Sequence, residues 1–179
     1  PHLLQTTLEL ENTLRALNGH YIEPSPSGAP TSGGADLLPT GRNFYSIDPR
    51  ALPTEPAWEI GKEMANNVIE QFIADEGHYP ESVGIILWAT NNMRNHGTCI
   101  AEFLYLMGLK PVWQPGSHRV TGVEVIPITE LKRPRIDVTG RISGLFRDSL
   151  PASVTWLDEA ADIIAKLDEP EDMNFVRKH

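Results

Sequence analysis

The clearest pattern of apolar and polar positions lies between Gly84 and Gly108. A short apolar run over residues 84–88 is typical of a strand that is buried on both faces. After polar residues 90–96, apolar side chains recur with the spacing of one helix face, at Ile100, Phe103, Leu104 and Met107. Gly108 can end that helix. A strand, a polar loop and a helix form the first half of a βαβ unit, in which ligands bind at the carboxyl end of the strand.

Helical and strand patterns alternate along the rest of the chain. A second helix is predicted from Thr54, a preferred N-cap residue, to Gly77, a preferred stop. A last helix follows residues 148–149, where Asp148 or Ser149 can cap it. Strands are predicted at 110–113, 120–126 (a strand or hairpin arm) and 136–142. The alternation predicts an α/β fold with a mainly parallel sheet flanked by helices, a Rossmann- or flavodoxin-like arrangement of three layers.

The first forty residues differ from the rest. Leucines at helical spacing predict an N-terminal helix up to Leu17. The following segment, 21–40, is rich in Pro, Gly and Ser and predicts a long irregular connection, and such connections are usually functional or mobile. We therefore expect an N-terminal helix and connection over 1–40 and an α/β domain over 41–179. Pro1 in place of Met predicts a processed chain or a piece of a longer one.

Composition narrows the class of protein. The 179 residues suffice for one domain with a sizeable core, and no apolar run has the length of a membrane span. The net charge of −9 argues against a nucleic-acid partner. A single cysteine, Cys99, excludes an internal disulfide and fits a reducing compartment, so we expect a cytoplasmic protein without a signal peptide.

Polar side chains follow three of the predicted strands. If the strands are parallel, the connections at 90–96, after Trp113 and at 143–148 open at one edge of the sheet. They carry many hydrogen-bonding groups: Asn91, Asn92, Arg94, His96, Gln114, Ser143, Arg147 and Asp148. Guanidinium groups suit carboxylates, so these connections predict a crevice for an anionic or amide-bearing organic ligand.

His96 and Cys99 have a His-x-x-Cys spacing at the start of the central helix. Two ligands leave half of a tetrahedral ion to water, so we expect no stable metal site there. His96 remains a candidate proton acceptor or transient metal ligand. The alternative is structural: a hydrogen-bonded histidine and a cysteine packed as a small apolar residue.

Several other residues allow two interpretations. Arg42 and Asn43, beside Gly41, either cap a helix or bind a ligand. Asp137 interrupts an apolar strand and needs a partner, which Arg135 or another guanidinium would supply. Tryptophans stack on a flat ligand or fill a core. Basic residues gather around the last strand, at Lys132, Arg133, Arg135, Arg141 and Arg147.

Taken together, several segments resemble the large subunit of the tetrapyrrole metal chelatases, the family that includes CobN cobaltochelatase and the corresponding large subunit of magnesium chelatase. The matching segments cover nearly the whole chain: 39–43 with 46–49, 87–88, 101–108 with 111–112, 133–138, 143–148, and 168–170 with 174–179. Family members are many times longer, so the resemblance implies a segment of such a subunit.

The resemblance implies ATP-dependent insertion of a divalent metal into a tetrapyrrole. ATP would be hydrolysed by separate AAA+ subunits, and the sequence has no P-loop pattern. Segments 109–113, 137–139 and 142–146 look more like the cobalt branch, which implies insertion of Co²⁺ into hydrogenobyrinic acid a,c-diamide. The alternatives are Mg²⁺ insertion into protoporphyrin IX, or a structural or partner-docking module. We expect the isolated segment to be inactive and to bind no cofactor stably.

The family commonly has a glutamate directly after the glycine at 97, where this chain has Thr98. If that carboxylate accepts pyrrole protons, either His96 or Glu102 takes its place, or this copy is altered in its metal or its activity. The implied substrate-binding residues are Arg42, Asn43, Asn91, Arg94, Ser143, Arg147 and Asp148. A shared open crevice for these side chains would favour the chelatase interpretation, and burial in paired networks would favour the structural one.

Overall fold

The computed structural model describes residues 5, 7–25, 38–42 and 47–179. The chain divides into two compact units, 1–48 and 49–179, which are described separately. No helix in the described ranges is both long and apolar enough to span a membrane. Asn43, an expected substrate-binding residue, lies outside the described residues.

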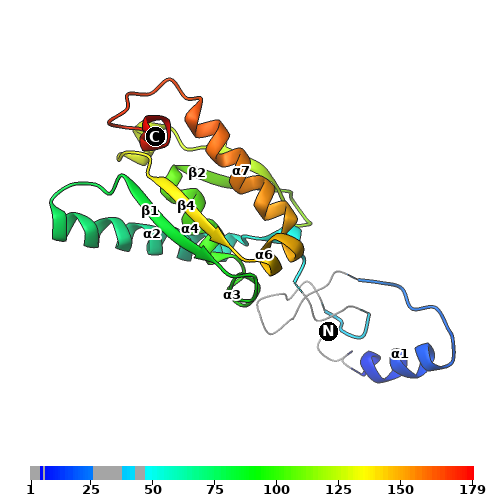
Figure 1. Cartoon of the computed structure of the whole chain (residues 1–179). Coiled ribbons are helices and arrows are strands. Elements are labelled where there is room, and N and C mark those ends of the chain that lie inside the picture. The colour runs from blue at the N-terminus through cyan, green and yellow to red at the C-terminus, as the bar shows by residue number, and fades with distance from the viewer. Residues whose placement is uncertain (1–4, 6, 26–37, 43–46) are drawn as a thin grey trace. The chain divides into compact units, whose positions relative to one another are not determined.

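The larger unit alternates helices and strands, as predicted (Figure 1). In chain order its elements are η4 (Pro49–Ala51), α2 (Glu55–Glu76), β1 (Ser82–Leu87), α3 (Ala89–Arg94), α4 (Thr98–Met107), β2 (Leu109–Trp113), β3 (Val120–Val125), α5 (Ile128–Leu131), β4 (Asp137–Ile142), α6 (Gly144–Ser149), α7 (Pro151–Ala165) and α8 (Phe175–Lys178). β1 pairs with β4 in parallel, and β2 pairs with β3 as an antiparallel hairpin. The predicted α/β class, with a parallel sheet and flanking helices, is confirmed.

Helix α4 is the centre of this unit. Every one of its residues except Tyr105 is buried, and it contacts α2, α7, β2 and both strands of the β1–β4 ribbon. The approach of α2 depends on Gly61, because a Cβ there would lie 2.5 Å from the Cβ of Ala101. The core therefore surrounds a helix that is apolar on nearly all sides, as expected for a buried helix.

Strand β1 is buried on one face only. Ile85 and Leu87 face the core, whereas Ile86 and Trp88 are 53% and 57% exposed. The prediction of a strand buried on both faces is therefore wrong. The cause is tertiary: α4 packs against the face that carries Ile85 and Leu87, and the opposite face is uncovered in the described part of the chain.

The helix ends follow most of the predicted caps. The Thr54 side chain accepts a hydrogen bond from the Ala57 amide, and Gly77 and Gly108 end α2 and α4 with positive φ. The predicted cap of the last helix is wrong, because α7 begins after Leu150 without a side-chain cap. A short extra helix, α6, intervenes, and Ser143 caps it.

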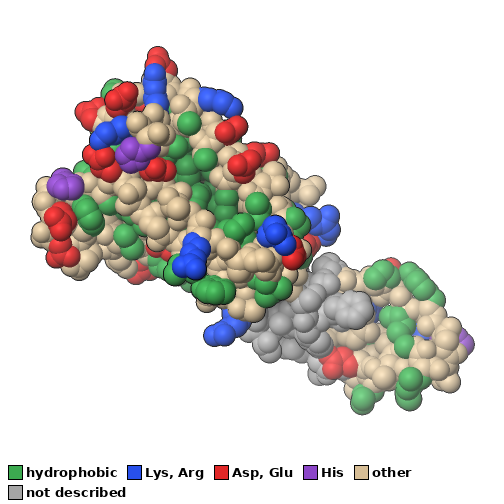
Figure 2. Space-filling model, viewed as in Figure 1, with side chains coloured by type: hydrophobic (Ala, Val, Ile, Leu, Met, Phe, Trp, Pro, Cys, Tyr) green, Lys and Arg blue, Asp and Glu red, His purple; other side chains and the backbone are tan. Residues whose placement is uncertain are grey.

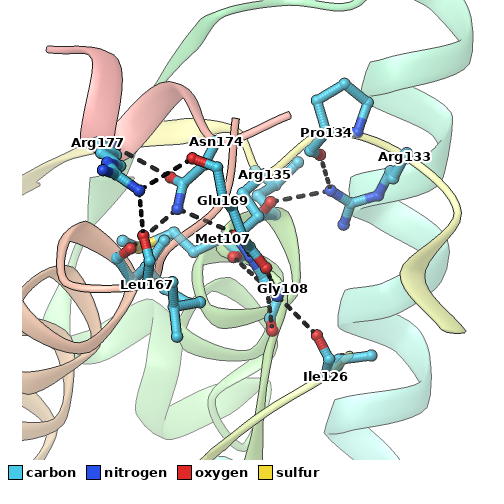
Figure 3. Close-up of polar contacts among 12 residues, drawn as sticks. Met107, Gly108, Ile126, Arg133, Pro134, Arg135, Leu167, Glu169, Asn174 and Arg177 are labelled. Atoms are coloured by element: carbon cyan, nitrogen blue, oxygen red, sulfur yellow. Dashed lines mark hydrogen bonds and ion pairs between the residues drawn. The ribbon is translucent and has the colours of Figure 1, made fainter. Parts of the chain in front are cut away.

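Two members of the basic cluster are structural (Figure 3). Arg135 is fully buried, donates to the carbonyls of Gly108 and Ile126 at 2.9 Å, and forms a two-point ion pair with Glu169 at 2.7 and 2.9 Å. Arg133 donates to the Leu106 carbonyl at 3.0 Å. These arginines donate to carbonyls at the C-terminal end of α4 that also accept backbone amides, Leu106 from Ile136 and Gly108 from Ile126.

Asp137 does not pair with an arginine, so that prediction is wrong. Its carboxylate lies 2.8 Å from Nδ1 of His179, and the neighbouring Glu81 binds Lys178. Arg135 is committed to Glu169 instead. The C-terminal residues thus close over the amino ends of β1 and β4, a contact between positions 42 apart that strand pattern alone does not reveal.

The smaller unit contains α1 (Leu8–Leu17). The predicted apolar stripe of this helix is exposed, with Leu10, Leu14 and Leu17 each more than 60% accessible. The buried residue is polar: Asn12 donates a side-chain hydrogen bond to the Gly41 carbonyl at 2.8 Å. This bond joins α1 to the segment 38–42.

Candidate functional site

Two of the three predicted connections meet at one edge of the β1–β4 ribbon. The strands pair in parallel from Ser82↔Asp137 to Leu87↔Ile142, so both end at the same edge. Helix α3 follows β1, helix α6 follows β4, and the two helices are in contact. The third connection follows β2, which pairs antiparallel with β3 in a separate ribbon. The assumption that places it beside the other two is therefore wrong.

Exposed apolar side chains lie beside arginines at this edge. We call the following seven residues the carboxyl-edge surface: Ile86, Trp88, Arg94, Arg141, Ile142, Leu145 and Arg147, all of them exposed. Strand register places Ile86 opposite Arg141 on the uncovered face of the ribbon. Figure 2 shows hydrophobic and basic side chains close together where β1 and β4 end.

The arginines of this surface are weakly engaged. Arg147 Nε lies 2.8 Å from Asp148 Oδ1, and both side chains are more than 60% exposed. This hydrogen bond lowers the pKa of the Asp148 carboxyl. Arg94 and Arg141 form no hydrogen bond or ion pair with another described residue. All three guanidinium groups are accessible to an anionic ligand.

His96 stands at the corner between α3 and α4. Its φ is +58°, a left-handed value that is uncommon for a residue other than glycine and often marks a functional or constrained position. Two hydrogen bonds hold the corner: the His96 carbonyl accepts from the Thr54 amide, and Asn95 Oδ1 accepts from the Gly97 amide, both at 3.1 Å. The half-buried imidazole has no hydrogen-bond partner in the described ranges.

The amides predicted at this edge bind the protein itself. Asn91 Nδ2 donates to the sulfur of buried Cys99 at 3.4 Å, and Asn92 Nδ2 donates to the Trp88 carbonyl at 3.0 Å. The Ser143 hydroxyl accepts from the Phe146 amide at 3.1 Å as the α6 cap. These hydrogen bonds hold the backbone and side chains at the carboxyl ends of β1 and β4. The Ser143 hydroxyl accepts in its bond, so its proton remains available for a further hydrogen bond.

Sequence reasoning misses the apolar half of this surface. The pattern favours a core position for Trp88 and gives Ile86 and Leu145 no functional role. Side chains in a strand alternate between the two faces, so the sequence alone does not place Ile86 and Arg141 on the same face. That placement requires the register of β1 against β4. Across the described ranges, no three His, Cys, Asp or Glu side chains come together as a metal site.

Comparison with known proteins gives the family. A family model described as CobN/Magnesium Chelatase matches residues 1–179. The chain is 47% identical to the aerobic cobaltochelatase subunit CobN of Sinorhizobium sp over 94% of its length, and 41% identical to the chloroplastic magnesium-chelatase subunit ChlH of Oryza sativa subsp. indica over 96%.

The whole chain also superimposes on a solved structure, the catalytic subunit of cobaltochelatase from Mycobacterium tuberculosis, with 48% identity and a TM-score of 0.75. The chain belongs to the CobN/magnesium chelatase family. It spans 13% of the Sinorhizobium protein, 12% of the rice protein and 15% of the tuberculosis chain. It therefore corresponds to a fragment of these large subunits.

Glu102 is the buried carboxyl nearest in sequence to Thr98, where the resemblance led us to expect a glutamate. The two residues lie one turn apart on the same face of α4, and each is less than 9% exposed. Burial raises the pKa of Glu102. Its carboxyl has no hydrogen-bond partner within the described part of the chain.

Arg42 belongs to the smaller unit and is half-buried there. Its carbonyl accepts a hydrogen bond from the Ser25 amide at 3.1 Å. The described site residues therefore fall into three groups: those at the α3–α6 edge of the larger unit, the buried Glu102 of α4, and Arg42 beside α1.

Proposed function

We propose that this chain is a segment of the large, tetrapyrrole-binding subunit of an ATP-dependent cobaltochelatase. In the proposed reaction, Co²⁺ is a substrate that enters hydrogenobyrinic acid a,c-diamide, and AAA+ partner subunits hydrolyse the ATP. Family membership supports the chelatase assignment, and the carboxyl-edge surface is the observation that carries the binding assignment. The cytoplasm is the proposed location, in keeping with a single cysteine.

The carboxyl-edge surface suits a large ring with polar arms. Trp88 and Ile86 offer an exposed apolar area, and a flat macrocycle can stack on an indole. Arg94, Arg141 and Arg147 lie at the same edge, where guanidinium groups can bind peripheral carboxylates through two hydrogen bonds each. This combination orients a ring by its rim while its apolar face contacts the protein.

Metal insertion also requires acceptors for two pyrrole protons. In this proposal the His96 imidazole accepts one, because imidazole is a common general base in proteins and no described residue occupies its nitrogens. Glu102 is the second acceptor. Burial raises the pKa of Glu102, which makes its carboxylate a stronger base.

The choice of cobalt over magnesium is supported by the larger identity to cobaltochelatase sequences, 45–48% against 41% for the rice magnesium subunit. Magnesium insertion into protoporphyrin IX is the alternative within the same family. Insertion assays that offer Co²⁺ and Mg²⁺ with each macrocycle separate the two.

A second function, docking within the parent subunit, is favoured by one specific observation. The carboxyl-edge surface is exposed in a chain that spans only 12–15% of its relatives, so other parts of a large subunit have room to cover it. Iodide quenching of Trp88, obtained as the difference between the parent subunit and its Trp88→Phe variant, tests this. If Trp88 is shielded from iodide in the absence of macrocycle, docking within the parent subunit is supported. If iodide quenches Trp88 and only added macrocycle prevents the quenching, macrocycle binding is supported.

The central test is macrocycle binding and metal insertion by the full-length parent subunit, reassembled with its ATPase partners. The Arg94→Gln/Arg147→Gln double variant should bind the macrocycle at least about tenfold more weakly, because charge-assisted hydrogen bonds contribute about 1.5–3 kcal/mol each. Lys166→Gln is the control, since Lys166 is exposed and its ion pair with Asp162 only joins α7 to its own C-cap. Equal binding by the double variant and the control would overturn the assignment.

A further inference from the structure

The corner that carries His96 is held in a conformation that a histidine does not favour. At a φ of +58° the side chain of an L-residue crowds its own backbone, and such angles persist only where the surrounding structure imposes them. The direction of the Cα–Cβ bond, and with it the place of the imidazole, follows from that angle. The contacts that impose the angle therefore also position the imidazole.

The contacts from outside the corner come from residues 52–54, which we call the strap. The Thr54 amide donates to the His96 carbonyl at 3.1 Å. Pro53 packs closely against the next residue of the corner, because a Cβ on Gly97 would lie 2.9 Å from the Pro53 Cα. The two strap residues before Thr54 are buried. The strap thus fixes the backbone on both sides of the peptide bond that follows His96.

A tryptophan 60 positions away anchors the strap. Trp113 is the last residue of β2, and its Nε1–H donates to the Pro53 carbonyl at 2.8 Å. An indole has a single N–H donor and no acceptor, so this bond uses its whole hydrogen-bonding capacity. The β2–β3 ladder shifts register between Val112 and Trp113, and irregularities of this kind redirect the side chains beside them. The end of β2 is therefore joined to the strap that contacts His96.

The other polar contacts at this place are weaker or local. His118, in the connection between β2 and β3, lies 3.5 Å from a carboxylate oxygen of Glu55, but both side chains are about 60% exposed, and exposed pairs contribute little. Asn95 Oδ1 accepts from the Gly97 amide at 3.1 Å and closes the turn from within. If this local bond alone imposed the angle at residue 96, Trp113 would have no influence on it.

We infer that Trp113 is a positioning residue for His96. Its indole N–H holds the strap, and the strap holds the corner in the conformation that directs the imidazole. This role rests on the proposed function, in which His96 accepts a pyrrole proton. Trp113 lies outside the carboxyl-edge surface and acts only through the corner.

The first test is structural and uses the 179-residue chain. The amide and α protons of one residue lie closer together at positive φ than at negative φ, so their nuclear Overhauser effect (NOE) reports the conformation of His96. Trp113→Phe removes the N–H donor but keeps an aromatic ring. It should weaken this NOE and shift the amide resonance of Thr54. An unchanged NOE in a folded Trp113→Phe chain would overturn the inference.

Trp156→Phe is the matched control. Trp156 lies on α7 and is half-buried like Trp113, but its indole makes no hydrogen bond with another described residue. Its replacement should leave the His96 NOE and the Thr54 amide unchanged. Equal changes in the two variants would mean that loss of any indole disturbs the corner, and the specific role of Trp113 would be wrong.

Measurements on the unmodified chain decide the matter even if Trp113→Phe does not fold. The indole proton of Trp113 should exchange with solvent more slowly than that of Trp156, because only the former is hydrogen-bonded within the described part of the chain. The amide–α NOE of His96 should be strong. Equal exchange of the two indole protons, or a weak NOE at His96, would contradict the inference.

The second test is metal insertion by the full-length parent subunit, reassembled with its ATPase partners. Trp113→Phe should lower kcat at least about tenfold, since misplacement of a positioned group by about 1 Å can cost about a hundredfold in rate. The Kd for the macrocycle should stay unchanged, because the carboxyl-edge surface is intact. In a His96→Ala subunit the same substitution should have no further effect on kcat, because Trp113 acts through His96. A weaker Kd with unchanged kcat, or an equal fall in kcat with and without His96, would contradict the positioning role.

Failure of this inference and failure of the proposed function give different results. If His96→Ala leaves insertion unchanged, the proposed role of His96 is wrong, and the positioning role in catalysis is wrong with it. If His96→Ala slows insertion and Trp113→Phe does not, the proposed role of His96 stands and only the inference about Trp113 is overturned.

Discussion

Arginines in two regions of the larger unit have opposite environments. Arg133 and Arg135 precede β4 and are buried against the C-terminal end of α4, where they bind carbonyls and Glu169. Arg141 and Arg147 follow shortly after in the sequence and are exposed at the carboxyl edge. The same residue type in one stretch of sequence thus stabilises the fold at one end of a strand and remains available to a ligand at the other.

The difference arises from the number of acceptors around each guanidinium. Arg135 Nε, Nη1 and Nη2 all have acceptors within the protein, so its desolvation is offset by a complete hydrogen-bond network. Arg147 pairs with one exposed carboxylate, and its own side chain is exposed to solvent. Substitutions in the two regions should therefore separate stability from binding.

The largest effect should come from Arg135→Ala. It leaves Glu169 without its ion-pair partner and removes a donor from the carbonyls of Gly108 and Ile126. We expect the free energy of unfolding to fall by about 3–5 kcal/mol, the usual cost of removing one partner of a buried pair. Urea denaturation followed by circular dichroism measures it.

Arg177→Ala is the matched control for this substitution. Arg177 binds Asp168 and two carbonyls of the same C-terminal segment but is 40% exposed. Its loss should cost about 0.2–1 kcal/mol, as for exposed ion pairs. Equal destabilisation by the two variants would mean that burial does not distinguish these arginines.

Arg133→Met should have the second largest effect. The guanidinium donates to the carbonyls of Leu106 and Pro134 and lies 4.9 Å from the centre of the Tyr105 ring. Burial lowers the pKa of Arg133 to about 10, so its charge is less well compensated than that of Arg135, which pairs with a carboxylate. We expect a loss of about 1.5–3 kcal/mol, the value of hydrogen bonds from a charged group, measured by the same denaturation. A loss larger than that of Arg135→Ala would reverse the ranking.

Glu102→Gln, unlike the arginine substitutions, should increase the stability of the fold, and only over part of the pH range. Burial raises the pKa of Glu102, so the folded chain binds this proton more tightly than the unfolded chain. Wild-type stability should therefore fall as pH rises from the usual glutamate pKa through the raised value, and then level off. The variant lacks this loss, so it should be the more stable form at neutral pH and equal to wild type in acid. Thermal unfolding between about pH 4 and pH 8 checks this, and a variant that is less stable at neutral pH would show that the carboxylate has a partner.

Local patterns in the sequence are sufficient for much of this fold. The Thr54 and Gly77 caps, the buried α4 helix and the position of His96 at the start of that helix depend on neighbours within one or two turns. The exposure of Ile86 and the role of Arg135 depend on residues that are distant in the chain. For example, Glu169 is 34 positions from Arg135. In the sequence, an apolar run or a basic cluster has the same pattern whether or not tertiary packing covers it or pairs it.

The smallest effect on stability should come from Arg147→Gln, and it decides between the two interpretations of the α3–α6 edge. If Arg147 and Asp148 only closed the loop before α7, their pair would have to stabilise the fold. Both side chains are more than 60% exposed and adjacent in sequence, so the pair restrains little chain. We expect a change below about 0.5 kcal/mol in the free energy of unfolding, within the range of ordinary surface substitutions.

The pKa of Asp148 should rise to its usual value in the variant, since the Arg147 hydrogen bond is the main cause of its lowering. Carbon-13 NMR titration of the Asp148 carboxyl measures that change alongside urea denaturation. Loss of more than about 1 kcal/mol would make Arg147 a structural residue like Arg135, and the carboxyl-edge surface would then lose one of its accessible guanidinium groups.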